Sequence, residues 1–203
     1  MVDTFFETTV EKDLIINARE LKYKGIFQPD TLFTTINKAL KERGFTLREK
    51  KTEEQVTETG RKTYVELRPF KSKTNYLALI LKIRINLDKV QEVVETVDDA
   101  KIRMHQGDIT IYFDAWVLTN WNLRWNMSPL TFFLKGFINK FLYIFPLEEG
   151  AKGELVGDTA YVYAQVKKFL MSYQPQEGKQ VREEDIREQV EAEMEKEMKE
   201  NTQ

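Results

Sequence analysis

The chain has 203 residues, of which 41% are hydrophobic and 32% are charged, and its formal net charge is −2. This length allows one domain with a substantial core, and the charge gives no whole-chain signature of nucleic-acid binding. The absence of cysteine excludes disulfides, thiol nucleophiles and Cys-ligated zinc, and a single histidine, His105, excludes a histidine-rich metal site. We therefore expect no metal, no cofactor and no catalytic motif.

The sequence predicts a cytoplasmic protein. The first residues carry acids where a secretory signal has a basic region, so we expect no signal peptide. A membrane-spanning helix needs a run of about 18 or more apolar residues. Lys135 and Lys140 interrupt the nearest candidate, so we expect no spanning helix.

The first two predicted elements are a strand and a helix. Residues 13–27 are rich in branched and aromatic side chains, which favours a strand that ends near Gly25 and Pro29. Residues 29–43 change to helical spacing, with proline in the first turn and Gly44 after the last. The apolar side chains of this helix are Leu32, Phe33, Ile36 and Leu40.

A run of strands follows, predicted at residues 45–57, 62–70, 75–88, 90–96, 100–105 and 108–118. The clearest is 75–88, because apolar residues alternate strictly along it. We expect one face of that strand to be buried, namely Leu77, Leu79, Leu81, Ile83, Ile85 and Leu87.

The stretch 116–145 concentrates apolar surface and contains all three tryptophans. Ser128 and Pro129 indicate the start of an amphipathic helix over 129–145, which Pro146 would end. A glycine-containing loop and a last core helix over 154–173 are expected after it.

The composition changes after Pro175. Residues 175–203 contain five Lys or Arg and ten Asp or Glu, a net charge of −5. We expect a single domain over 1–174 and an acidic, Glu-rich tail over 175–203 that is disordered or a solvated helix. The alternative is a helix that docks on a partner, since Ile186, Val190, Met194 and Met198 recur every four residues.

This element order indicates an α+β fold. We expect an antiparallel sheet of about six to seven strands, one helix after the first strand, and two C-terminal helices packed on one face. Over residues 13–173 the order resembles the helix-grip (START/Bet v 1-like) arrangement, from which the helix at 129–145 departs. The resemblance implies a cavity between sheet and helix that takes an apolar ligand.

A second resemblance is local. It rests on Lys73-Thr74-Asn75-Tyr76, on the junction Trp125-Asn126-Met127-Ser128-Pro129-Leu130 and on the pair Phe133-Leu134. These segments resemble a pattern found in uncharacterised archaeal proteins. The resemblance implies provenance and no function.

Aromatic residues and an arginine provide the first candidate site for a ligand or partner. The residues of this site are Trp116, Trp121, Arg124 and Trp125. Tryptophan and arginine dominate binding hot spots, so one interpretation is a recognition surface. The other interpretation is that these side chains anchor the loop, with the arginine stacked on an indole ring. Phe132 and Tyr143 add apolar surface to the second face of the helix 129–145. That face is either core or a contact for a protein partner, including a second copy of the chain.

The polar face of the sheet is the second candidate. It is expected to carry Arg68, Lys82, Arg84, Tyr112 and Asp114. Aromatic and basic side chains on a sheet bind RNA or single strands in some folds, and they are also typical of a solvated antiparallel face. We expect Asp114 to pair with Arg84 or Lys82.

The sequence therefore favours a non-enzymatic binding or interaction protein that takes an apolar ligand or a protein partner. One alternative is peripheral membrane association through the helix 129–145. A second is RNA or single-strand binding on the polar sheet face, although the charge does not favour nucleic acid. A third is an enzyme that uses acids of the sheet, such as Glu66 or Asp114.

Overall fold

The computed structural model describes residues 10–58, 60–97, 100–120, 146–173 and 182–201. The predicted helix 129–145 and most of the aromatic stretch lie outside the described residues. The described chain has an α+β fold, as the sequence predicts.

A six-stranded antiparallel sheet forms the framework of the fold. Its strands are β1 (Glu11–Phe27), β2 (Glu49–Thr57), β3 (Gly60–Leu67), β4 (Phe70–Ser72), β5 (Leu77–Val97) and β6 (Ala100–Thr119). They lie in the order β1-β6-β5-β3-β2, and β4 pairs with β5. Strands β1 and β2 are the two edges, so the sheet is open.

Strands β5 and β6 are each continuous, where the sequence predicts two shorter strands in place of each one. The break in the periodicity of β5 is a bulge between Asp88 and Gln91, with Lys89 at a φ of 56°. A glycine faces the bulge from each neighbouring strand, Gly60 on β3 and Gly107 on β6. A Cβ on Gly60 would lie 2.9 Å from Lys89 C, and one on Gly107 would lie 2.9 Å from Asp88 O, so neither position has room for a side chain. The two glycines let the neighbouring strands approach a backbone that bulges outward.

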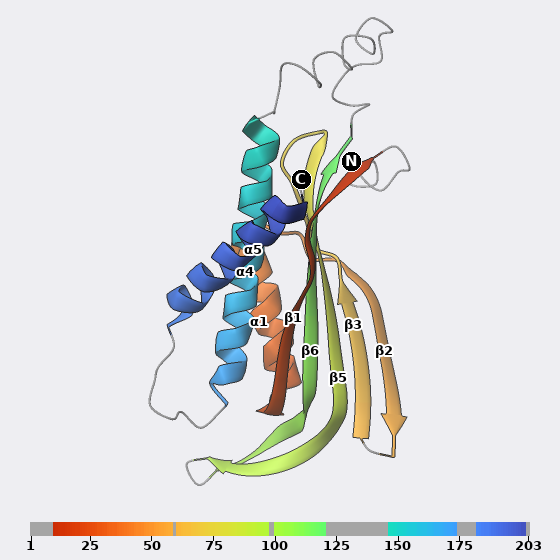
Figure 1. Cartoon of the computed structure of the whole chain (residues 1–203). Coiled ribbons are helices and arrows are strands. Elements are labelled where there is room, and N and C mark those ends of the chain that lie inside the picture. The colour runs from red at the N-terminus through yellow and green to blue at the C-terminus, as the bar shows by residue number, and fades with distance from the viewer. Residues whose placement is uncertain (1–9, 59, 98–99, 121–145, 174–181, 202–203) are drawn as a thin grey trace, which may run out of the picture.

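The apolar face of the sheet is buried as predicted. Alternation places Leu77, Leu79, Leu81, Ile83, Ile85 and Leu87 in the core, each at most 3% exposed. In the described part of the chain three helices cover this face: α1 (Pro29–Glu42), α4 (Pro146–Met171) and α5 (Glu183–Asn201). Figure 1 shows all three on the same side of the sheet, with α5 crossing α4. The arrangement of sheet and C-terminal helices is helix-grip-like.

Helix α4 begins earlier than the sequence suggests. Pro146 is the first described residue of this helix, and Gly150, Gly153 and Gly157 lie inside it instead of in a loop. Each glycine costs a helix about 1 kcal/mol relative to alanine. Burial outweighs this cost, because α4 places Leu155, Val156 and several later residues in the core.

The acidic tail contributes a core helix, so the expectation of a solvated tail does not hold for α5. Ile186, Val190 and Met194 are at most 4% exposed and belong to the main core cluster. Arg19 of β1 pairs with Glu193 and Glu197 of α5. One apolar residue per turn is sufficient here because α5 lies against α4 and β1 and does not form a coiled coil.

We predict that Met194→Ala lowers the free energy of unfolding by about 2 to 3 kcal/mol, because it leaves a cavity where the side chain is fully buried. Glu195→Ala on the exposed side of α5 is the matched control and should change stability by less than about 0.5 kcal/mol. Urea unfolding of both variants provides the measurement. Equal stability of the two would contradict the docking of α5.

Candidate functional site

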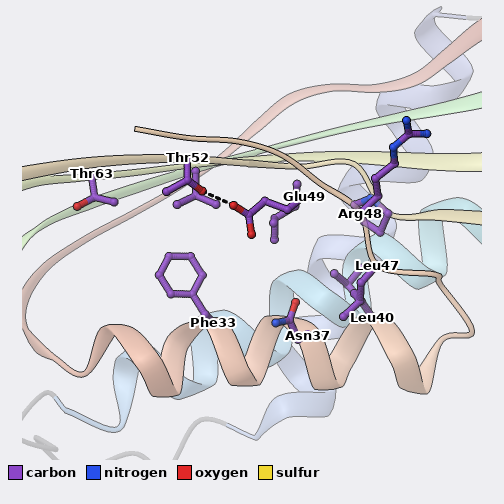
Figure 2. Close-up of a pocket in the computed structure, with 11 residues that line it drawn as sticks. Phe33, Asn37, Leu40, Leu47, Arg48, Glu49, Thr52 and Thr63 are labelled. Atoms are coloured by element: carbon purple, nitrogen blue, oxygen red, sulfur yellow. Dashed lines mark hydrogen bonds between the residues drawn. The ribbon is translucent and has the colours of Figure 1, made fainter. Parts of the chain in front are cut away.

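A groove lies on the helix side of the sheet, between α1 and the strands β2 and β3. Its volume is about 430 Å³. The residues that line it are Phe33, Asn37, Leu40, Leu47, Arg48, Glu49, Thr52, Thr63, Val65, Leu67 and Pro69. Figure 2 shows Phe33 and Asn37 extending from α1 toward Glu49 and Thr52 on the opposite wall.

The local structure explains why the groove exists. Helical spacing puts Phe33, Asn37 and Leu40 on the side of α1 that faces the sheet, and Leu40 is fully buried. On the other wall, Thr52 of β2 is paired with Val65 of β3, so the two side chains share a face. Every residue of β2 is exposed, so the groove opens along this edge of the sheet.

The groove has an apolar floor and a polar rim. Leu40, Val65 and Pro69 are buried at its base. Its charged lining residues are Arg48 and Glu49, and the Thr52 hydroxyl donates a 2.5 Å hydrogen bond to Glu49. This combination can bury a hydrocarbon body and orient a small polar end.

The sequence-predicted residues that the structure describes lie on the opposite face of the sheet. They are Arg68, Lys82, Arg84, Tyr112, Asp114 and Trp116. Trp121, Arg124, Trp125, Phe132 and Tyr143 lie outside the described residues. The groove itself was not predicted residue by residue, because its two walls come from segments whose distance the sequence does not reveal.

The centre of this outer face is a network of paired charges. As predicted, Asp114 pairs with Arg84, at 3.0 Å, and the Arg84 guanidinium lies 5.1 Å from the centre of the Tyr112 ring. The other Asp114 oxygen accepts a 2.9 Å hydrogen bond from the backbone N–H of Ala18, where β1 bulges. Asp114 therefore fixes the irregular edge strand to the sheet.

Glu66 is also held by its neighbours on this face. Arg68 Nε donates to it at 2.6 Å and the Tyr64 hydroxyl donates at 2.9 Å. Desolvation alone would raise the pKa of Glu66, but these hydrogen bonds outweigh it and the pKa is lowered. An ionised carboxylate has no proton to donate, and each oxygen of Glu66 already accepts a hydrogen bond. This arrangement therefore gives Glu66 a structural role.

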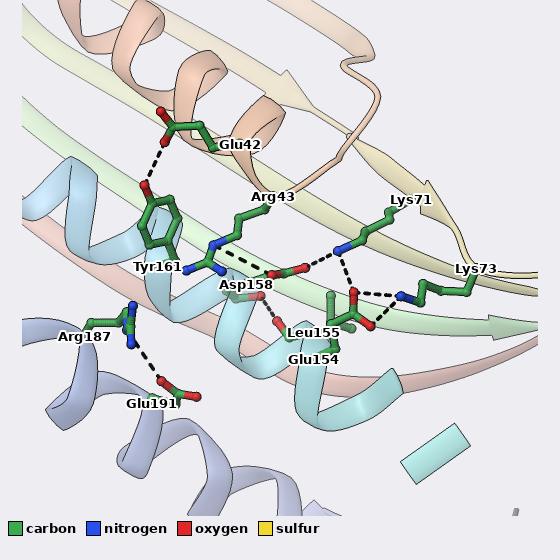
Figure 3. Close-up of polar contacts among 11 residues, drawn as sticks. Glu42, Arg43, Lys71, Lys73, Glu154, Leu155, Asp158, Tyr161, Arg187 and Glu191 are labelled. Carbon is green, nitrogen blue, oxygen red and sulfur yellow. Dashed lines mark hydrogen bonds and ion pairs between the residues drawn. The ribbon is translucent and has the colours of Figure 1, made fainter. Parts of the chain in front are cut away.

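A partly buried charge cluster that the sequence analysis missed joins α4 to the sheet (Figure 3). Lys71 Nζ of β4 lies 2.6 Å from Glu154 Oε1 and 2.9 Å from Asp158 Oδ2. Lys73 Nζ lies 2.7 Å from Glu154 Oε2, and Arg43 Nε lies 3.9 Å from Asp158 Oδ1. The spacing of four between Glu154 and Asp158 indicates one helix face, but nothing in the sequence identifies their partners.

The pKa shifts show how this cluster is balanced. Burial alone would lower the pKa of Lys71, but its hydrogen bonds to Glu154 and Asp158 outweigh this effect and raise it. Burial raises the pKa of Asp158, and the Lys71 contact offsets only part of that effect. Lys71 is thus held charged, whereas Asp158 retains a net cost of burial. The cluster fastens α4 to β4 and to the end of α1.

Among the described residues, no group of three or more His, Asp or Glu is placed to bind a metal ion. None of the helices in the described part of the chain is long and apolar enough to cross a membrane. Comparison of the chain with protein-family models, curated proteins and solved structures found no match.

We predict that Lys71→Met destabilises the fold by about 2 kcal/mol, because it leaves Asp158 buried without its main partner. Lys73→Met removes the same charge from a more exposed pair and should cost less than about 1 kcal/mol. Thermal and urea unfolding measure the difference. A smaller loss in Lys71→Met than in Lys73→Met would show that the cluster does not fasten α4.

Proposed function

We propose that the protein is a non-enzymatic binding protein that takes an apolar or amphiphilic small molecule in the groove between α1 and β3. The observation that carries this proposal is a groove of about 430 Å³ with a buried apolar floor. Sites for small ligands have volumes of roughly 300 to 1,000 Å³ and are lined mainly by apolar side chains with a few polar groups.

The groove lies at a different place from the cavity that the helix-grip resemblance implies. The helix-grip resemblance implies a cavity between the sheet and a C-terminal helix. In that space Phe113 of β6 packs on Tyr163 of α4, with ring centroids 5.5 Å apart. The open space lies against α1 instead, where β2 and β3 extend past the helices.

The polar rim defines the class of ligand. Asn37, Thr52 and Thr63 are neutral hydrogen-bonding groups, and Arg48 and Glu49 carry opposite charges. A rim without net charge favours a neutral or zwitterionic polar end. We therefore expect a hydrocarbon chain or ring system with a small head that has no net charge.

Two other functions have weaker support. Strand addition at β2 is disfavoured, because Lys50, Lys51, Glu53 and Glu54 place charges along that edge. Nucleic-acid binding across the outer face is disfavoured at its centre, where Arg84 is already paired with Asp114.

The proposal can be tested with N-phenyl-1-naphthylamine, a neutral apolar dye whose fluorescence rises in apolar sites. We expect wild type to bind the dye and Thr63→Trp to bind it at least about tenfold more weakly, because the indole fills the groove. Thr110→Trp places the same side chain on the outer face of β6 and serves as the control.

The control should bind the dye as wild type does. Equal affinity of the two tryptophan variants, or no binding by the folded wild type, would refute the proposal. Near-UV and far-UV circular dichroism establish that each variant is folded.

A further inference from the structure

A second pocket lies on the outer face of the sheet, opposite the groove. Its volume is about 240 Å³, and its described lining residues are Lys12, Arg68, Ile80, Lys82, Trp116 and Leu118. We propose that this pocket binds a small soluble anion attached to an aromatic or aliphatic body. The inference is independent of the proposed function, because it concerns other residues on the other face.

Strand pairing brings the lining residues together. Trp116 of β6 is the partner of Ile80 of β5, and Leu118 of β6 is the partner of Lys12 of β1. Partners across an antiparallel pair point to the same face. Lys82 follows Ile80 by two positions on β5 and therefore shares that face. Three strands thus converge on one small area, together with Arg68 from the segment between β3 and β4.

The base of the pocket is apolar, although it faces away from the main core. Ala78, Ile80 and Leu118 are at most 8% exposed and form a separate cluster. Val10, Phe70 and Trp116 pack against this cluster and remain partly exposed. Such a floor offers contact area for the body of a ligand, and the Trp116 indole offers a surface for stacking.

The charge of the pocket selects an anion. Among the described residues that line it, three are cations and none is a carboxylate. Arg68 is paired with Glu66, and Lys82 also acts on Glu66 electrostatically and lowers its pKa. Within the described part of the chain, however, no carboxylate lies within 4.0 Å of the Lys12 or Lys82 ammonium. This differs from the centre of the same face, where Arg84 and Asp114 neutralise each other. Cations beside an apolar floor attract a charged head more strongly than cations in open water.

These features define the ligand class. Lysine and arginine side chains can donate charge-assisted hydrogen bonds to a carboxylate, sulfonate or phosphate. The adjoining apolar floor and indole suit a ring or a short chain. The size of the pocket favours a compact soluble molecule over an extended lipid surface.

The probe is 8-anilinonaphthalene-1-sulfonate, which joins an anion to aromatic rings and fluoresces when bound in an apolar site. We expect Lys12→Gln and Lys82→Gln each to weaken its binding by about tenfold or more, as for loss of one charge-assisted hydrogen bond. Lys24→Gln is the matched control, because Lys24 lies on the same strand as Lys12 and is paired with Asp108 far from the pocket.

The control should bind as wild type does, and added salt should weaken binding to wild type. Thr63→Trp distinguishes the two sites. It blocks the groove, so it should leave the binding of the anionic probe to the outer-face pocket unchanged. The proposal fails if all three lysine variants bind alike, or if Thr63→Trp abolishes binding. It also fails if the protein binds anionic phosphatidylglycerol vesicles through Lys12 and Lys82 but not the soluble probe.

Discussion

Burial of one face of the β5–β6 hairpin is the constraint on which the rest of the structure depends. Alternating residues of both strands lie in the core, including Leu81 and Phe113, each at 0% exposure. A shift of register by one residue would turn every one of these side chains to the outside. The hairpin therefore fixes its own pairing, and it then positions β1 on one side, β3 and β4 on the other, and α4 across its face.

The two candidate sites follow from how this hairpin is covered. Helix α4 packs on its buried face, whereas α1 covers the flank toward β2 and β3 less completely and leaves the groove. No helix of the described chain covers the outer face. At the centre of this exposed face, Asp114 and Glu66 pair with arginines, so the charges there are balanced. The cation-lined pocket near Trp116 is the part of the face where they are not.

Local patterns in the sequence predict the sheet and α1 well. The alternation from Leu77 to Leu87 and the helical spacing from Leu32 to Leu40 each encode one buried face within a single element. Features that depend on distant residues were missed or predicted wrongly. Three glycines of α4 suggest a loop until the buried face of the helix is known, and the single apolar residue per turn of α5 is sufficient only beside α4 and β1. The sequence did not identify the residues of the groove. Of the residues that line the outer-face pocket, Trp116, Arg68 and Lys82 were named from the sequence, but their meeting in one pocket depends on strand order.

The bulge at Lys89 divides the long hairpin into two parts with different neighbours. Toward Leu77 and Thr119, both strands have a third strand beside them. In the pairs from Val93–Met104 to Val97–Ala100, each strand has only its hairpin partner among the described residues. Isolated two-stranded ribbons are marginally stable in water. The backbone amides of this arm should therefore exchange with solvent deuterium through local opening, while the same two strands, a few residues away, exchange only when the whole domain unfolds.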